Sequence, residues 1–152
     1  MKVGIDIGST TIKYVVMDSN KNIIHKDYSR HFSEIGTALT NTLTNLKNIV
    51  GETKFKIALA GSAGMGIAKK ISLPFVQEVI ACQTAVDEFI PVTDTVVELG
   101  GEDAKIIYLN GATEVRMNGV CAGGTGSFID HMASLLSTDA FGLNALAEKG
   151  KQ

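Results

Sequence analysis

Two short segments of the chain carry an acid, glycine, further polar side chains and a lysine in the same order. The first is DIGSTTIK, whose candidate ligand-binding residues are Asp6, Gly8, Ser9, Thr10, Thr11 and Lys13. A tight turn at a glycine lets the backbone approach a ligand and gathers N–H groups into an anion-binding concavity. The hydroxyls and the lysine would donate to phosphate oxygens, and Asp6 would hold Mg²⁺ through water. The segment is interpreted as a phosphate-binding hairpin, against the alternative of an ordinary β-hairpin with a solvated acid.

The second segment, ELGGEDAK, supplies the same parts through Gly100, Gly101 and Lys105, with acids at Glu98 and Asp103. Glu98, Gly100 and Lys105 each stand 92 positions after their counterparts in the first segment. This constant offset indicates an internal repeat. Two such hairpins facing each other across a cleft would hold a nucleoside triphosphate and its metal, with Glu98 or Asp103 as the acid near the γ-phosphate. Neither segment is a P-loop, because no glycine–lysine–serine/threonine sequence follows the glycines.

An α/β framework must position these hairpins, and the apolar periodicity and turn signals predict one. The first copy is expected to contain strands at 3–7, 11–18, 23–30 and 55–61 and helices at 32–50 and 76–90, with a glycine-rich loop at 62–70 that turns into a short helix. The second is expected to contain strands within 97–109 and at 114–117, then helices at 124–136 and 138–149, the former with a core face. This predicts a βββαβα lobe at 1–91 and an incomplete second lobe at 92–152, as in a fragment of a longer protein.

A third motif, NGVCAGGTGSFIDHM, places Cys121 just before Gly123, Gly124, Thr125 and Gly126, at the start of an expected helix. Three interpretations compete: a buried structural thiol, a phosphate cradle, or a ligand to an anionic group. A helix N-terminus presents unpaired N–H groups and a partial positive charge. The glycines allow close backbone approach, so an anionic, thiolate-ligated cluster is a suitable occupant.

The paired hairpins resemble those of the superfamily of acetate and sugar kinases, heat-shock chaperones and actin, in which two ribonuclease H-like lobes bind ATP. The cysteine–glycine motif resembles that of BadF/BadG/BcrA/BcrD-type ATPases, the activators of 2-hydroxyacyl-CoA dehydratases and benzoyl-CoA reductases. The resemblance implies that Cys121 ligates a [4Fe–4S] cluster shared between two subunits of a homodimer, or between tandem copies in a longer chain. It further implies that ATP hydrolysis drives a low-potential electron to the dehydratase or reductase partner.

Three features depart from that family pattern. The family has a second cluster cysteine downstream of the glycine loop, but no cysteine follows Cys121 here. Cys82 lies upstream on an apolar helix face and is expected to be a buried small hydrophobe. Glu98, Glu102 and Ser127 stand where many relatives have aspartate, glutamine and arginine. The second ligand is therefore elsewhere or the cluster is lost, and a small-molecule kinase or a degenerate nucleotide-binding scaffold stays open as an alternative.

Composition bounds the class of protein. The chain has 152 residues, a net charge of −2 and 45% hydrophobic residues, which suggests neither a nucleic-acid nor a membrane partner. It carries no apolar run long enough for a membrane span and no signal peptide, so a cytoplasmic location with reduced thiols is expected. His25, His31 and His131 lack metal-like spacing and are expected to be surface or capping residues. The GSAGMG segment at 61–66 is expected to be a core loop near the cleft.

Overall fold

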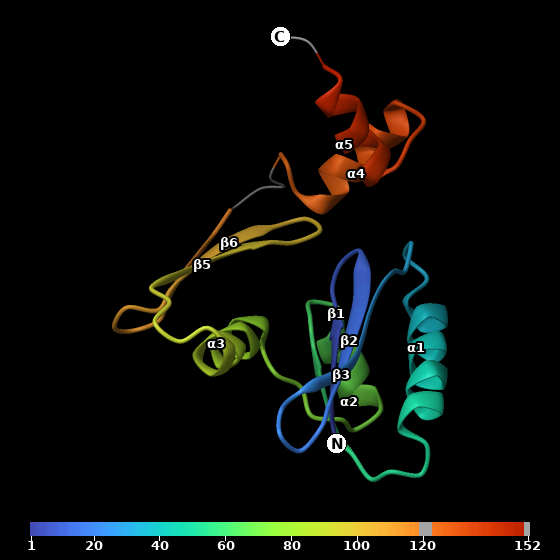
Figure 1. The fold of residues 1–152 in the computed structure, drawn as a ribbon, viewed down its shortest axis with the longest axis vertical. Helices are drawn as coiled ribbons and strands as arrows, with labels where there is room; N and C mark the ends of the chain where they lie inside the picture. The colour runs from blue at the N-terminus through green and yellow to red at the C-terminus, as the bar shows by residue number, and fades with distance from the viewer. Residues whose placement is uncertain (119–122, 151–152) are drawn as a thin grey trace. The chain divides into compact units, whose positions relative to one another are not determined.

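The structure is a computed structural model that describes residues 1–118 and 123–150. The chain divides into two compact units, Met1–Thr93 and Asp94–Gln152 (Figure 1). The first unit contains β1 (Lys2–Ile7), β2 (Thr11–Met17), β3 (Ile23–Arg30), α1 (Ile35–Val50), β4 (Lys56–Ala60), α2 (Gly64–Lys70) and α3 (Glu78–Phe89). The second contains β5 (Thr95–Leu99), β6 (Ala104–Tyr108), β7 (Glu114–Met117), α4 (Gly126–Leu135) and α5 (Ala140–Glu148). The predicted α/β class and order of elements are confirmed.

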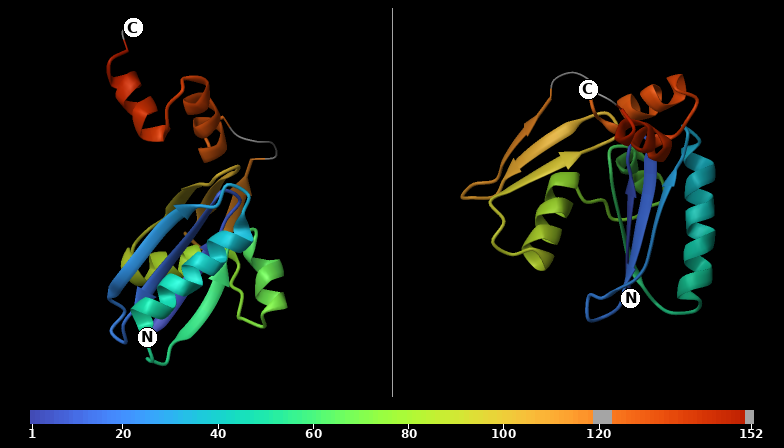
Figure 2. Two further views of the ribbon diagram at one scale, coloured as in Figure 1. Left: turned by 90° about the vertical axis from the view of Figure 1, so that its right-hand side faces the viewer. Right: turned by 45° about the horizontal axis from the view of Figure 1, so that its top comes forward.

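The first unit is built on a four-stranded sheet in the order β3-β2-β1-β4. β1 and β2 form an antiparallel hairpin, whereas β1 and β4 run parallel because α1 provides the crossover between them. Alternate residues of β1, namely Val3, Ile5 and Ile7, are buried on one face. They form a core with Leu46 and Val50 of α1, which lies along this face (Figure 2).

Helix α1 begins later than its apolar periodicity predicts. The expected helix includes Phe32, but Phe32 is 81% exposed and lies outside α1. Phe32 and Ser33 both have positive φ, at 46° and 67°, which a right-handed helix excludes. The helix then ends at Gly51, whose φ of 55° suits glycine best.

The opposite face of this sheet carries small residues, including Gly4 and Ala58, and borders a cavity of about 740 Å³ that also reaches α3. Helix α3 forms where it is predicted, but none of its residues is buried. Ile80 and Phe89 are 52% and 53% exposed. Cys82, on the same helix, is half-buried, so the expectation of a buried thiol is not met.

The second unit has an antiparallel sheet in the order β5-β6-β7, and α4 packs against α5. The expected core face of α4 is wrong, because Phe128, Leu135 and Leu136 are 46%, 67% and 57% exposed. Ala133 is the buried residue of this helix. α5 and the hairpin turn at which α4 begins leave the larger side chains uncovered. Among the described residues, no helix is both long and apolar enough to cross a bilayer.

Candidate functional site: two equivalent hairpins

The first hairpin joins β1 to β2 through a tight turn. The Gly8 N–H donates to the Thr11 carbonyl at 2.9 Å, closing the turn. Asp6 and Lys13 lie directly opposite each other on the two strands, and Lys13 Nζ contacts Asp6 Oδ2 at 2.7 Å. Both side chains are more than one-third exposed, at 38% and 40%, so the lysine stays accessible to a ligand.

The second hairpin, β5–β6, repeats this geometry residue for residue. The Gly100 N–H donates to the Asp103 carbonyl at 2.8 Å, and Glu98 pairs with Lys105 across the strands. Each of these positions lies 92 residues after its equivalent in the first hairpin. The internal repeat inferred from the sequence is therefore present in strand register and in turn geometry.

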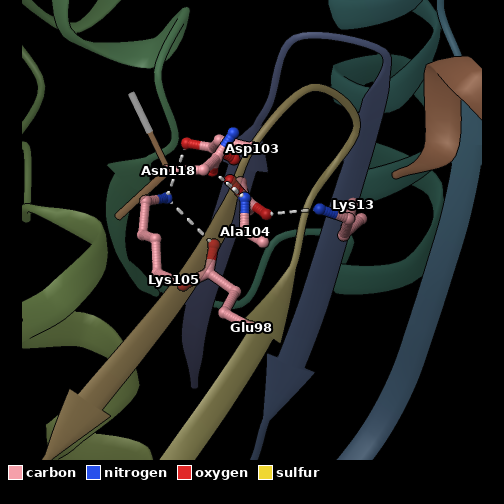
Figure 3. Close-up of polar contacts among 7 residues, drawn as sticks. Lys13, Glu98, Asp103, Ala104, Lys105 and Asn118 are labelled. Atoms are coloured by element: carbon pink, nitrogen blue, oxygen red, sulfur yellow. Dashed lines mark hydrogen bonds and ion pairs between the residues drawn. The ribbon is translucent and has the colours of Figure 1, made fainter. Parts of the chain in front are cut away.

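The two lysines nevertheless differ in their electrostatic surroundings. Lys105 Nζ lies between two carboxylates, 3.1 Å from Glu98 Oε1 and 3.3 Å from Asp103 Oδ2, and its side chain is 9% exposed (Figure 3). Two negative charges thus surround one positive charge in a poorly solvated position, whereas Lys13 faces one carboxylate. The first hairpin consequently offers an anion the more accessible cation.

The glycine at each turn serves a different purpose. A Cβ at Gly8 would meet nothing closer than 3.6 Å and would lie 3.9 Å from Lys13 Nζ, so the chain itself does not require glycine there. A Cβ at Gly100 would come within 2.5 Å of Asp103 Oδ1, so that glycine makes room for the protein's own carboxylate. The space over Gly8 is left open beside the exposed lysine, as a bound anion would need.

The donors of the first turn are also available. Ser9 is exposed and Thr10 half-exposed, whereas Thr11 is buried. Within the described residues, the N–H groups of Ser9 and Thr10 donate to no other residue. The turn thus presents backbone and hydroxyl donors next to Lys13, which is the donor set expected of a phosphate-binding loop.

Gly61 is a site residue whose role the sequence analysis missed. Its φ is +96°, and a Cβ there would overlap both the Ile7 carbonyl oxygen and Asp6 Oδ1. The next turn also bonds to β1, because the Ala63 N–H donates to the Ile7 carbonyl at 3.0 Å. The GSAGMG segment therefore packs against the carboxylate of Asp6. The segment directly follows β4, which runs parallel to β1, and this order of elements is the signal that could have predicted its place beside Asp6.

His31 and Asn118 hydrogen-bond to the first and the second hairpin, respectively. The sequence predicted this role for neither residue. His31 is buried, at 4% exposed, so of the predicted surface or capping positions the surface one is wrong, and its Nε2 lies 3.0 Å from the Gly8 carbonyl oxygen. Asn118, the residue after β7, accepts a hydrogen bond from the Ala104 N–H at 2.7 Å (Figure 3). Their hydrogen-bond partners are distant in sequence, so local patterns do not reveal them.

The glycine motif before α4 is attached to the second hairpin. The Gly126 N–H donates to the Gly100 carbonyl at 3.1 Å, and the Ser127 N–H donates to the Gly101 carbonyl at 2.7 Å. A Cβ at Gly126 would lie 3.3 Å from Gly101 Cα, so this glycine allows the helix to begin on the turn. Two N–H groups of the helix N-terminus are therefore already used within the protein.

The remaining residues of this motif are exposed or lie beyond the described structure. Gly123 and Gly124 are exposed, and a Cβ at either would meet nothing within 4 Å, while Thr125 is buried. Cys121 lies outside the described residues. Within residues 1–118 and 123–150, no group of three or more histidine, cysteine or acidic side chains is placed to hold a metal ion.

Comparisons with known proteins agree with this geometry. The sequence profile of the BadF/BadG/BcrA/BcrD ATPase family matches residues 3–152. The (R)-2-hydroxyglutaryl-CoA dehydratase activating ATPase of Acidaminococcus fermentans is 30% identical over 97% of the chain. The chain spans only 58% of that relative's length.

Solved structures show the same fold. The activator of the 2-hydroxyisocaproyl-CoA dehydratase from Clostridium difficile, with bound ADPNP, superposes with a TM-score of 0.78 at 25% identity. That match covers 99% of this chain and 57% of the other. The ethanolamine utilization protein EutJ from Carboxydothermus hydrogenoformans shares the fold, with a TM-score of 0.63 at 17% identity over 97% of this chain and 60% of that chain. The expected actin-like ATPase architecture is thereby confirmed.

Proposed function

Because the chain belongs to the BadF/BadG/BcrA/BcrD ATPase family, we propose that it is the nucleotide-binding part of an ATP-dependent activator. The whole protein would hydrolyse ATP to drive a low-potential electron from a [4Fe–4S] cluster to a 2-hydroxyacyl-CoA dehydratase-like partner. The observation that supports this best is the pair of hairpins with matching register and turn hydrogen bonds. A structural relative of the same fold carries an ATP analogue.

Within this proposal, the first hairpin binds phosphate through the N–H groups of Ser9 and Thr10 and the charge of Lys13. On phosphate binding, the lysine would exchange part of its contact with Asp6 for phosphate oxygens. The half-exposed Asp6 carboxylate would then hold Mg²⁺ through water, as hard oxygen ligands do. Gly8 leaves the space that the phosphate occupies.

The second hairpin would bind phosphate through the turn at Gly100 and Gly101. Lys105 holds Glu98 and Asp103 together, which places both proposed catalytic acids at one point of the turn. A carboxylate in such a position can orient an attacking water near a γ-phosphate. Gly126 ties α4 to the same turn, and Gly123, Gly124 and Thr125 complete the proposed cofactor-binding loop.

The described residues do not fit a [4Fe–4S] cluster by themselves. Cys82 is the one cysteine among them, and it lies on α3 in the first unit. Cys121 is the proposed ligand, and the other ligands would come from a further segment and from a second copy or subunit. The dehydratase-like partner is likewise proposed from the relatives, whose length this chain spans only in part.

The nucleotide proposal is tested by calorimetric titration of the chain with Mg-ADPNP. Lys13→Met should weaken the affinity about ten-fold, because it removes a charge-assisted hydrogen bond to phosphate. Lys21→Met is the matched control, since Lys21 is also a half-exposed, ion-paired lysine of the same unit, with Glu88 as its partner. Equal affinities for the wild type and Lys13→Met would rule out the first hairpin as the phosphate site.

The cluster proposal is tested by anaerobic iron–sulfur reconstitution followed by visible and electron paramagnetic resonance spectra. A cluster signal that is lost in Cys121→Ala and retained in Cys82→Ala is expected. Absence of any cluster in the complete protein, together with phosphorylation of a sugar or carboxylic acid, would favour the kinase alternative.

A further inference from the structure

His31 contacts two carbonyl groups in the turn of the first hairpin, those of Gly8 and Thr10. It is the first residue after β3, and it is buried, at 4% exposed. Its backbone N–H donates to the Thr10 carbonyl at 3.2 Å, and its Nε2 lies 3.0 Å from the Gly8 carbonyl oxygen. The Ser33 N–H lies 3.1 Å from its Nδ1.

These partners determine the tautomer of the imidazole ring. A carbonyl oxygen can only accept a hydrogen bond, so Nε2 must carry the proton that it donates to Gly8. The Ser33 N–H can only donate, so Nδ1 must be the unprotonated acceptor. Both ring nitrogens are therefore satisfied in one neutral form, which locks the ring against rotation and fixes the direction of the Nε2–H bond.

The bond from His31 sets the orientation of the Gly8–Ser9 peptide group. A trans peptide is planar, and its C=O and N–H bonds point in opposite directions. When the Gly8 carbonyl points toward His31, the Ser9 N–H must point away from it. Glycine has the widest choice of backbone conformations, so without this contact the peptide would be free to rotate and turn the Ser9 donor aside.

We propose that His31 is a positioning residue for phosphate binding, because it holds the Gly8–Ser9 peptide with the Ser9 N–H directed at the anion. The inference rests on the proposed nucleotide-binding function of this hairpin. His31 lies outside the hairpin, yet the direction of the Ser9 N–H depends on it.

The backbone around His31 supports a role beyond packing. Phe32 and Ser33 follow it with φ values of 46° and 67°, and two consecutive non-glycine residues in the left-handed region are energetically costly. The Glu34 N–H donates to the His31 carbonyl at 2.7 Å, which closes this kink. The strained segment delivers the imidazole to Gly8 and leaves the Phe32 side chain in solvent, so the strain does not serve burial of an apolar group.

The second hairpin is braced in a comparable way by a different residue. Asn118 also directly follows the third strand of its unit. Its side-chain oxygen accepts from the Ala104 N–H at 2.7 Å, and its backbone N–H donates to the Ala104 carbonyl at 3.3 Å. A polar residue after the third strand thus holds the hairpin in both units, and this residue is histidine in the first unit and asparagine in the second.

Two variants separate the contact to Gly8 from the contact to Ser33. The Asn side-chain oxygen lies near the place of Nδ1, so His31→Asn keeps an acceptor for Ser33 and loses the donor to Gly8. The Gln amide nitrogen reaches the place of Nε2, so His31→Gln keeps the donor to Gly8. Backbone amide NMR of the chain, titrated with Mg-ADPNP, then follows the Ser9 resonance, and thermal melts verify that each variant is folded.

The expected result is that the Ser9 resonance shifts and saturates in the wild type. The affinity should be about ten-fold weaker in His31→Asn, as for the loss of a well-aligned hydrogen bond to a charged group, and within about two-fold of wild type in His31→Gln. Undiminished binding by His31→Asn would overturn the inference and leave the proposed function standing. Absence of binding by the wild type would overturn both.

A measurement on the wild type alone serves if either variant fails to fold. Long-range proton–nitrogen NMR spectra report which ring nitrogen of His31 carries the proton. A proton on Nε2 is the expected outcome. A proton on Nδ1, or a mixture of the two tautomers, would contradict the hydrogen bond to Gly8 and with it the positioning role.

Discussion

Gly61→Ala tests how the loop after β4 supports Asp6 at the first hairpin. The structure leaves no room for a side chain at this position, since a Cβ would overlap the Ile7 carbonyl oxygen and Asp6 Oδ1. The first of these is a backbone atom of a central strand, so rotation of a side chain cannot relieve the overlap. In addition, φ at Gly61 is +96°, in a region that L-residues other than glycine rarely adopt.

The expected loss of stability follows from these two effects. The unfavourable backbone conformation costs roughly 1–2 kcal/mol, and forcing extra atoms into a packed site costs about 1–3 kcal/mol. Gly61→Ala should therefore lower the free energy of unfolding by about 2–5 kcal/mol, a large share of the ~5–15 kcal/mol of a typical domain. Displacement of the Asp6 carboxylate should also weaken Mg-ADPNP binding.

Gly66→Ala is the matched control in the same loop-and-helix segment. A Cβ at Gly66 would meet nothing within 4 Å, and the residue lies inside α2. Alanine there should raise the free energy of unfolding by about 0.5–1 kcal/mol, because it favours the helix over the unfolded chain. Urea denaturation followed by circular dichroism measures both changes. Equal stabilities for the two variants would refute the packing of Gly61 against Asp6.

Four further predictions concern the hairpins and their sheet. Gly8→Ala should leave the melting temperature unchanged within about 2 °C, because its Cβ meets only ordinary contacts, yet weaken Mg-ADPNP binding in calorimetry. Lys105→Met should lower the free energy of unfolding by about 2 kcal/mol in urea titrations, since it leaves two carboxylates without their shared cation. Lys13→Met, at an exposed pair, should cost less than about 1 kcal/mol. Burial and the negative charge of Asp27 raise the pKa of Tyr14 above its ordinary value of 10.0. The folded state therefore holds this proton more tightly than the unfolded state, so the free energy of unfolding of the wild type should fall as the pH rises above 10.0. Tyr14→Phe has no such proton and should lack this part of the fall.

The sequence predicted those parts of the site that depend on local pattern. The strand pattern and the glycine turn between Asp6 and Lys13 predicted a hairpin, and the pairing of β1 with β2 confirms it. The repeat carried the same inference to Glu98 and Lys105. Spacing therefore sufficed to predict both hairpins, whereas the ion pair between each acid and its lysine was not predicted.

Features that depend on distant contacts were not predictable in this way. His31 is buried because it bonds to Gly8, 23 positions earlier in the chain, and no periodicity encodes such a contact. The close approach of Gly61 to Asp6 arises from the parallel pairing of β4 with β1. The predicted core face of α4 failed for a related reason, since an apolar stripe on a helix does not show whether another element covers it.

Hydrogen–deuterium exchange of the chain with and without Mg-ADPNP tests most directly whether the repeated hairpins bind nucleotide phosphate. The amides of the turn residues 9–10 and 101–102 should exchange at least about ten-fold more slowly in the presence of the nucleotide, as expected for donors that become hydrogen-bonded. Those of α5, which lies outside both hairpins, should not change. Unchanged exchange at both hairpins, in a chain that binds ADPNP by calorimetry, would place the nucleotide elsewhere and contradict the account.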